Sequence, residues 1–249
     1  MRIELINLDR SGDRLASFTS ANAHLSDVRR FAAADGQQIK PANMIRAGMI
    51  DPAVLPRFTP GALGCALSHL ILWKRAIAER TPLTITEDDA IFHFDFERHA
   101  ADALKKVPET WDIIFWGINC GAHIAYAPIG GGEPRTMIVD RDSCRARLAT
   151  FQGRPIAPVL YRLLQMAGTV CYSISPKGAA ALTRLCLPLR PIIRMTDGVR
   201  REISGTLGVD LAMNEHYPRL QAFLCEPPLA LSPNDPAKST VQVATKPAR

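Results

Sequence analysis

Short hydrophobic runs alternate along the chain with segments of helical spacing, and this order predicts an α/β fold. The first run, IELINLD at residues 3–9, places its apolar side chains at strand spacing. A turn at Ser11 and Gly12 follows, and Leu15 and Phe18 then begin a segment with helical spacing. This strand–turn–helix beginning is typical of nucleotide-binding α/β proteins, although it lacks a glycine-rich phosphate loop.

The clearest helix signal begins at Thr59. Thr59 is a favoured N-cap residue, Pro60 suits the first helical position, and Pro82 ends the pattern. The apolar positions between them predict one buried helix face, formed by Leu63, Leu67, Leu70, Ile71 and Ile77. Gly64 costs about 1 kcal/mol relative to Ala inside a helix, so its presence indicates close packing or a nearby ligand.

The remaining pattern predicts a single domain over residues 1–232 with a mostly parallel central sheet. We expect further strands within residues 28–36, 83–86, 112–118, 169–175 and 220–231, and a helix over residues 176–186. Residues 40–60 carry four prolines and predict irregular structure, whereas residues 135–165 show no clear pattern. The tail at residues 233–249 is polar and lacks periodicity, so we expect it to be flexible or loosely docked.

Composition and charge narrow the class of protein. The 249 residues are 47% hydrophobic and 22% charged, which is ordinary for a soluble globular protein. The N-terminal segment is too short and too charged for a signal peptide or a membrane helix, and no long apolar span follows it. We therefore expect a cytoplasmic protein.

Positive charge is concentrated in the second half of the chain. Residues 1–134 hold 14 Lys/Arg and 16 Asp/Glu, whereas residues 135–249 hold 16 and 8, within a net charge of +6. A basic half favours an anionic partner, such as a phosphorylated substrate, the anionic inner face of a membrane or nucleic acid, and the alternative is a solvated basic surface. The basic residues are scattered among few aromatic residues, which argues against a nucleic-acid partner.

The cysteines show no metal-binding or disulfide pattern. None of the six is paired at C-x-x-C spacing, and nothing in the sequence indicates secretion. We expect six reduced thiols, most of them buried as small apolar groups. They are Cys65, Cys120, Cys144, Cys171, Cys186 and Cys225.

Three adjacent carboxylates, Glu87, Asp88 and Asp89, stand where the predicted strand LTIT ends. Ligands of α/β sheets bind outside the carboxyl ends of strands, so this is a favourable place for chemistry. If the alternation of the strand persists, Glu87 and Asp89 project to one side and Asp88 to the other. Such an acid-x-acid pair suits Mg²⁺ or Mn²⁺ bound together with a diphosphate, and the alternative is a solvent-exposed acidic turn.

Two further groups are candidates for ligand contact. Arg10 and Arg14 follow the first strand, where they either reach the phosphates or base of a nucleotide or form an exposed basic helix start. Ser68 and His69 lie off the apolar face of the helix that begins at Pro60. His69 is then either a functional histidine or a satisfied, partly buried one.

Six segments of the chain, in this order, resemble glycosyltransferase family 25. This family comprises the lipooligosaccharide biosynthesis glycosyltransferases, to which collagen galactosyltransferases are related. The resemblance covers residues 3–231, and its most specific part is the G-x-x-G-C-x-L-S-H helix followed by E-D-D. The segments are INLDRSGDR, FAAADG, TPGALGCALSHLILWKRAI, LTITEDDAIF, DIIFWG and GTVCYSISPKGAAAL.

The resemblance implies a glycosyltransferase A-type fold, a Rossmann-like α/β/α sandwich with a metal-binding acidic motif. It also implies transfer of galactose or glucose from a UDP-sugar with inversion at the anomeric carbon, to a glycan or glycolipid acceptor. On this chain Glu87 and Asp89 become ligands of Mn²⁺ or Mg²⁺, and Asp88 orients the donor. The donor-binding residues carried over are Asn7, Leu8, Arg10, Arg14, Ser68 and His69, with a small-residue segment at Gly168, Thr169, Tyr172, Ser175, Gly178 and Ala179.

The chain departs from the family pattern at two places. Ala62 stands where the family often has Glu, and the downstream catalytic carboxylate is either Asp197 or Asp210. We assign the general base to one of these two aspartates, and His216 is a candidate additional metal ligand. The missing acid at Ala62 favours an alternative function, a catalytically silent protein that binds a nucleotide sugar or glycan on the same fold.

Overall fold

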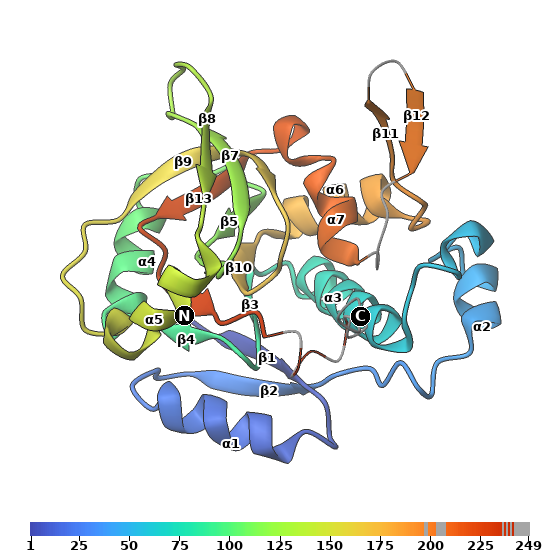
Figure 1. Ribbon diagram of the computed structural model, residues 1–249, viewed down its shortest axis with the longest axis horizontal. Helices are drawn as coiled ribbons and strands as arrows, with labels where there is room; N and C mark the ends of the chain where they lie inside the picture. The colour runs from blue at the N-terminus through green and yellow to red at the C-terminus, as the bar shows by residue number, and fades with distance from the viewer. Residues whose placement is uncertain (197–198, 203–207, 236, 238, 240, 242–249) are drawn as a thin grey trace, which may run out of the picture.

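The computed structural model describes residues 1–196, 199–202, 208–235, 237, 239 and 241 (Figure 1). Its α-helices are α1 (Gly12–Ala21), α2 (Pro41–Arg46), α3 (Pro60–Glu79), α4 (Phe96–Leu104), α5 (Arg141–Phe151), α6 (Pro176–Cys186) and α7 (Val209–Asn214). Its first strands are β1 (Ile3–Asn7), β2 (Val28–Ala32), β3 (Leu83–Glu87), β4 (Ile91–Phe92), β5 (Ile113–Phe115), β6 (Gly117–Asn119) and β7 (His123–Ala127). The remaining strands are β8 (Arg135–Ile138), β9 (Val159–Met166), β10 (Cys171–Ile174), β11 (Ile193–Thr196), β12 (Val199–Glu202), β13 (Ala222–Glu226) and β14 (Ala230–Ser232).

The central sheet has nine strands in the order β2-β1-β3-β10-β5-β13-β9-β7-β8. The pairs β1–β2, β1–β3 and β5–β13 are parallel, and the other five pairs are antiparallel. The α/β class is therefore confirmed, but the sheet is mixed rather than mostly parallel. The difference arises because β7, β8 and β9 form antiparallel pairs at one edge, and β10 enters between β3 and β5 in the opposite direction.

Helices cover both faces of this sheet, which gives the expected α/β/α layers (Figure 1). On one face α3, α6 and α7 contact one another over a large apolar core that includes Trp73, Leu182 and Met213. On the other face α1 and α4 contribute Phe18 and Phe96 to a second core. The two helical layers cover the faces of the sheet. Side chains from both halves of the chain therefore meet at the ends of the strands.

Helix α3 begins as its sequence predicts. The Thr59 hydroxyl accepts a hydrogen bond from the backbone N–H of Ala62 at 3.0 Å, and Pro60 is the first helical residue. Gly64 is needed for close packing, because an added Cβ would lie 2.4 Å from the backbone oxygen of Ala34. Gly64 therefore lets the helix approach the loop that follows β2.

The predicted buried face of α3 is wrong at two of its five positions. Ile71 and Ile77 are 41% and 37% exposed, whereas Ser68 and His69 are wholly buried. The reason is that α3 contacts both the sheet, through β3, and its neighbouring helices α6 and α7, so positions outside a single apolar stripe are also covered. Side chains that look like a polar flank in the sequence therefore lie inside the protein.

Two of the six cysteines are paired, so the expectation of six reduced thiols is wrong for them. Cys120 and Cys144 form a disulfide with a Cα–Cα distance of 5.4 Å. It joins the turn after β6 to α5, and the 24-residue separation carries no short-range motif. Cys65, Cys171, Cys186 and Cys225 are free thiols.

Several segments without a clear sequence signal are ordered. Helix α2 lies in the proline-rich stretch at residues 40–60, and α5 and β9 lie within residues 135–165. Part of the tail contacts the domain, since Arg145 donates hydrogen bonds to the backbone oxygens of Pro233 and Asn234. Among the described residues, no helix has the length and apolar character needed to span a membrane.

Candidate active site

The three adjacent carboxylates lie at the end of β3, next to the end of β1. Strands β1 and β3 are parallel, and their register pairs Ile6 with Glu87. The acidic motif therefore lies at the carboxyl edge of the sheet, where ligands of α/β proteins bind. The three side chains contact different parts of the protein from this point.

Asp88 is held against β1 and α1. Its Oδ2 accepts a hydrogen bond of 2.7 Å from the side-chain amide of Asn7, and its Oδ1 accepts one from Arg14. Burial disfavours the charge of Arg14, but attraction to Asp88 outweighs it and raises the pKa of the guanidinium. Asp88 thus points away from its two neighbours, and protein donors bind both of its oxygens.

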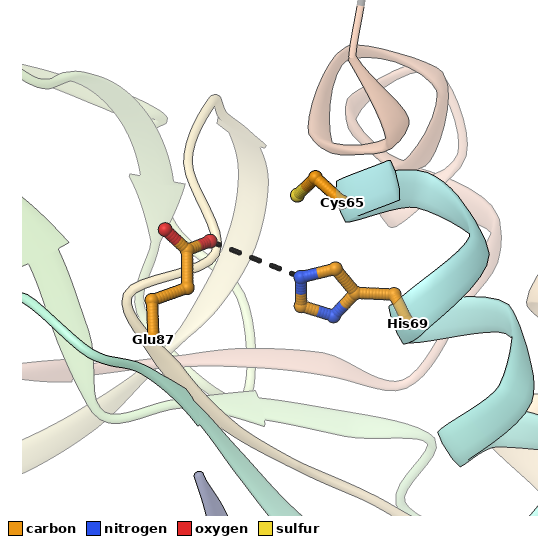
Figure 2. A group of neighbouring side chains, drawn as sticks. All are labelled: Cys65, His69 and Glu87. Carbon is orange, nitrogen blue, oxygen red and sulfur yellow. Dashed lines mark ion pairs between the residues drawn. The ribbon is translucent and has the colours of Figure 1, made fainter. Parts of the chain in front are cut away.

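Glu87 points to the opposite side, toward α3 (Figure 2). Its Oε1 accepts a hydrogen bond from the Thr169 hydroxyl and lies 3.8 Å from Nε2 of His69. Burial raises the pKa of Glu87, but the neighbouring His69 and Thr169, helped by Arg14, bring it below its ordinary value. Glu87 therefore carries negative charge at neutral pH.

His69 is supported by a buried hydrogen-bond chain. Its Nδ1 lies 2.7 Å from the hydroxyl of Tyr172, and that hydroxyl accepts a hydrogen bond of 2.9 Å from the indole N–H of Trp73. Ser68 instead bonds backbone, since its hydroxyl accepts from Ala34 N–H and donates to the Gly64 carbonyl. Of the two, only His69 is aimed at the acidic motif.

Asp89 contacts the last strand of the chain. Its Oδ2 accepts a hydrogen bond of 2.7 Å from the hydroxyl of Ser232, which ends β14. Its Oδ1 is buried and has no hydrogen-bond partner among the described residues. Burial, followed by repulsion from Glu87, raises the pKa of Asp89 to about 6.

Asp210 belongs to the same electrostatic environment. Its Oδ2 accepts a hydrogen bond of 2.9 Å from the backbone N–H of Gly168, the residue before the Thr169 that contacts Glu87. Burial and then repulsion from Glu87 raise the pKa of Asp210. Gly168 has φ +103°, and an added Cβ would lie 2.3 Å from Asn119, so this connection requires glycine.

The other sequence candidates lie elsewhere or outside the description. His216 lines a separate cavity of about 270 Å³ with Cys186 and Glu215, and it belongs to neither cluster of potential metal ligands among the described residues. Arg10 pairs with Asp35. Asp197 lies outside the described residues, so Asp210 is the member of that pair that the structure describes.

The residues at this edge fit a hard divalent cation. Carboxylate oxygens are the ligands that Mg²⁺ and Mn²⁺ prefer, and a buried oxygen without a partner, such as Oδ1 of Asp89, is costly unless something compensates its charge. Repulsion between Glu87 and Asp89 adds to this cost. A cation bound by these carboxylates would offset both costs.

Similarity to known proteins indicates the family of the chain. The family model described as "Glycosyltransferase family 25 (LPS biosynthesis protein)" matches residues 1–196, which include the acidic motif, Asn7, His69 and Thr169. The chain belongs to glycosyltransferase family 25. Within this family 25 chain, Asp210 and Ser232 lie beyond the matched segment.

Three curated relatives illustrate the similarity. A glycosyltransferase 25 family member of Aedes aegypti is 30% identical over 125 residues, which is 46% of this chain and 21% of the relative. Procollagen galactosyltransferase 2 of Mus musculus is 29% identical over 126 residues, 46% of this chain and 20% of the relative. A putative glycosyltransferase, R655, of Acanthamoeba polyphaga mimivirus is 27% identical over 123 residues, 48% of this chain and 38% of the relative. The matches thus span only a fifth to two fifths of these relatives.

Sequence reasoning missed two contacts of this family 25 chain. Ser232 lies 143 residues from the Asp89 that it contacts, and only its place at the end of a strand hinted at a role. Cys65 lies four residues before His69, so the two share a helix face, a spacing that a search for metal ligands could have used.

Proposed function

We propose that the chain is a metal-dependent, inverting glycosyltransferase. It moves a hexose, galactose or glucose, from a UDP-sugar to a glycan or glycolipid acceptor in lipooligosaccharide or cell-surface polysaccharide synthesis. The observation that carries the proposal is the unpaired buried oxygen of Asp89, next to Glu87 at the carboxyl edge of the sheet. Membership of glycosyltransferase family 25 supports the reaction class, and similarity to the mouse procollagen galactosyltransferase 2 supports galactose.

Glu87 and Asp89 would hold Mn²⁺ or Mg²⁺ in this reaction. When bound, the ion stabilises negative charge on the departing diphosphate. The protein keeps these two carboxylates in position through Thr169 and Ser232, so little reorganisation is needed when the donor arrives. Asp88 has a different role, because Asn7 and Arg14 already bind its oxygens. It fixes the end of β1 beside the donor.

Asp210 is the proposed general base. An inverting transfer needs a carboxylate that removes the proton of the acceptor hydroxyl as that oxygen attacks the anomeric carbon. Burial and repulsion from Glu87 raise the pKa of Asp210, which makes its carboxylate a stronger base than an exposed aspartate. The Gly168 N–H bonds one of its oxygens and thereby orients the carboxylate.

The charge of the second half of the chain supports an anionic acceptor. Residues 135–249 carry twice as many basic as acidic residues, 16 against 8. Such an excess attracts an anionic glycolipid and brings the protein to the negative inner face of a membrane as a peripheral contact.

A UDP-release screen tests the proposal. We would incubate the full chain with a panel of nucleotide sugars and candidate glycan acceptors, with Mn²⁺ or with a chelator. We expect metal-dependent release for one UDP-hexose, and a fall of about 10²-fold or more in Asp89→Ala. Near-normal metal-dependent turnover in Asp89→Ala would refute the assignment, and binding of UDP with Mn²⁺ but without turnover of any donor would point to a binding protein.

A further inference from the structure

Helix α3 presents a thiol and an imidazole to the acidic edge. Cys65 and His69 lie one helical turn apart and both side chains point toward Glu87 (Figure 2). The sulfur of Cys65, a ring nitrogen of His69 and a carboxylate oxygen of Glu87 all lie within 4.8 Å of one another. A soft ligand (the sulfur), an intermediate one (the imidazole nitrogen) and a hard one (the carboxylate oxygen) therefore lie close enough together to bind one ion.

His69 is the most informative member of this group. The residue is wholly buried, and its Nε2 has no hydrogen-bond partner among the described residues. The 3.8 Å between Nε2 and Glu87 Oε1 is too long for a hydrogen bond. It is close to the separation of about 3.4 Å expected for two ligands about 2.1 Å from one tetrahedral ion. The ring therefore points a free polar atom at a place where an ion would fit.

The other nitrogen of the His69 ring is held by a hydrogen bond. Nδ1 lies 2.7 Å from the Tyr172 hydroxyl, and either group can be the donor; when the ring donates, His69 is the tautomer that has its proton on Nδ1. In that tautomer Nδ1 donates to Tyr172 and the lone pair of Nε2 is available to a ligand. The hydrogen bond from Trp73 to the same hydroxyl holds Tyr172 in place.

A second cluster in the described part of the chain provides a contrast. His93, Asp95 and His99 also lie within ligand distance of one another. Both ring nitrogens of His93 are engaged, however, because Nε2 contacts the Arg154 carbonyl at 2.7 Å and Nδ1 accepts from the backbone of Asp95 at 3.0 Å. A cation that binds His93 would have to displace one of these hydrogen bonds, whereas His69 offers an unpaired nitrogen.

We propose that Cys65, His69 and Glu87 form a binding site for a thiophilic divalent cation of the zinc class. A thiolate, an imidazole and a carboxylate are ligands that Zn²⁺ accepts in tetrahedral sites, and a water molecule supplies the fourth position. On binding, the Cys65 thiol releases its proton to solvent and the sulfur–metal bond forms. The site shares Glu87 with the metal site of the proposed transfer reaction, and the two are told apart by their other ligands, Cys65 and His69 here and Asp89 there.

Cobalt titration of the reduced, metal-free full chain tests the proposal, with Co²⁺ as the spectroscopic substitute for Zn²⁺. We expect one equivalent of Co²⁺ to give a thiolate-to-cobalt charge-transfer band and the visible bands of tetrahedral coordination, both removed by Zn²⁺. The assay needs no sugar donor, so its outcome does not depend on transferase activity. Absence of the charge-transfer band in the unmodified chain at saturation would overturn the proposal.

Variants locate the ligands. Cys65→Ser and His69→Gln should lose the charge-transfer band or weaken cobalt affinity at least tenfold, whereas Cys225→Ser and His99→Gln should keep both. Circular dichroism establishes that each variant is folded. A band that survives in folded Cys65→Ser would overturn the assignment.

A measurement on the unmodified chain covers the case in which a variant does not fold. Cys65 is partly exposed, so iodoacetamide can reach it. One equivalent of Zn²⁺ should slow its alkylation at least tenfold, as read by peptide mass spectrometry. Equal alkylation of Cys65 with and without Zn²⁺ would contradict the proposal.

Discussion

Replacing Asp89 with Asn should stabilise the metal-free protein at neutral pH. Burial and repulsion from Glu87 raise the pKa of Asp89 from 3.8 to about 6. At about 1.4 kcal/mol per pKa unit, ionised Asp89 lowers the free energy of unfolding by about 3 kcal/mol at most. The Asn side chain removes the charge and keeps an oxygen that accepts from Ser232. We therefore expect a gain of about 1–3 kcal/mol.

The pH dependence gives the sign of the effect. Because the folded-state pKa of Asp89 lies above its unfolded value, the folded state binds the proton more tightly. Its destabilising contribution is present above pH 6 and disappears as the pH falls from about 6 toward 4. The gain from Asp89→Asn should therefore be large at pH 7.5 and small at pH 4.5.

Urea unfolding with a chelator present, at both pH values, measures this difference. Asp102→Asn is the matched control, because Asp102 forms only an exposed ion pair with Lys105 and should change stability by less than about 1 kcal/mol. In addition, Mn²⁺ should raise the melting temperature of the unmodified chain but not of Asp89→Asn. A variant that is less stable than the unmodified chain at pH 7.5, or equally affected at both pH values, would refute the reasoning.

Three further predictions concern packing, the buried hydrogen-bond chain and the base. Gly64→Ala should destabilise the protein by about 1–3 kcal/mol in urea unfolding, because its Cβ would lie 2.4 Å from a backbone oxygen, whereas Gly12→Ala, with open space around it, should not destabilise. Tyr172→Phe should lower the free energy of unfolding by about 1–3 kcal/mol in the same assay, because it leaves the buried indole N–H of Trp73 unpaired. The control Tyr126→Phe, at a half-buried position, should lower it less, and equal losses would contradict this. Asp210→Asn should lower kcat about 10²–10⁴-fold with little change in UDP affinity. In the pH profile of kcat/KM of the unmodified chain, the acid limb should lie above the ordinary pKa of aspartate. An unchanged kcat would exclude Asp210 as the base.

Local signals in the sequence predicted the parts of the site that depend on neighbouring residues. The Thr59 cap and Pro60 located the start of α3, and the apolar run before the three carboxylates located β3. Hydrogen bonds and backbone dihedrals within a few residues determine these features, so a single segment contains enough information to predict them.

Features that depend on distant segments could not be predicted in the same way. Strand β10 pairs antiparallel with β3 and β5, and no periodicity within β10 indicates which strands lie beside it. His69 packs against Tyr172 of β10, which lies 103 residues further along the chain. The same holds for the contact between Asp89 and Ser232 and for the Cys120–Cys144 disulfide, since each joins segments that only the completed fold brings together.

The central claim is that Glu87 and Asp89 bind a divalent ion that carries the diphosphate of a UDP-sugar. Isothermal titration of UDP into the full chain, with Mn²⁺ or with a chelator, tests it without any acceptor. We predict that Mn²⁺ tightens UDP binding at least tenfold, about 1.4 kcal/mol, in the unmodified chain, and that this gain is lost in Asp89→Ala. UDP affinity that is the same with Mn²⁺ and with chelator, or a gain that survives in Asp89→Ala, would contradict the account.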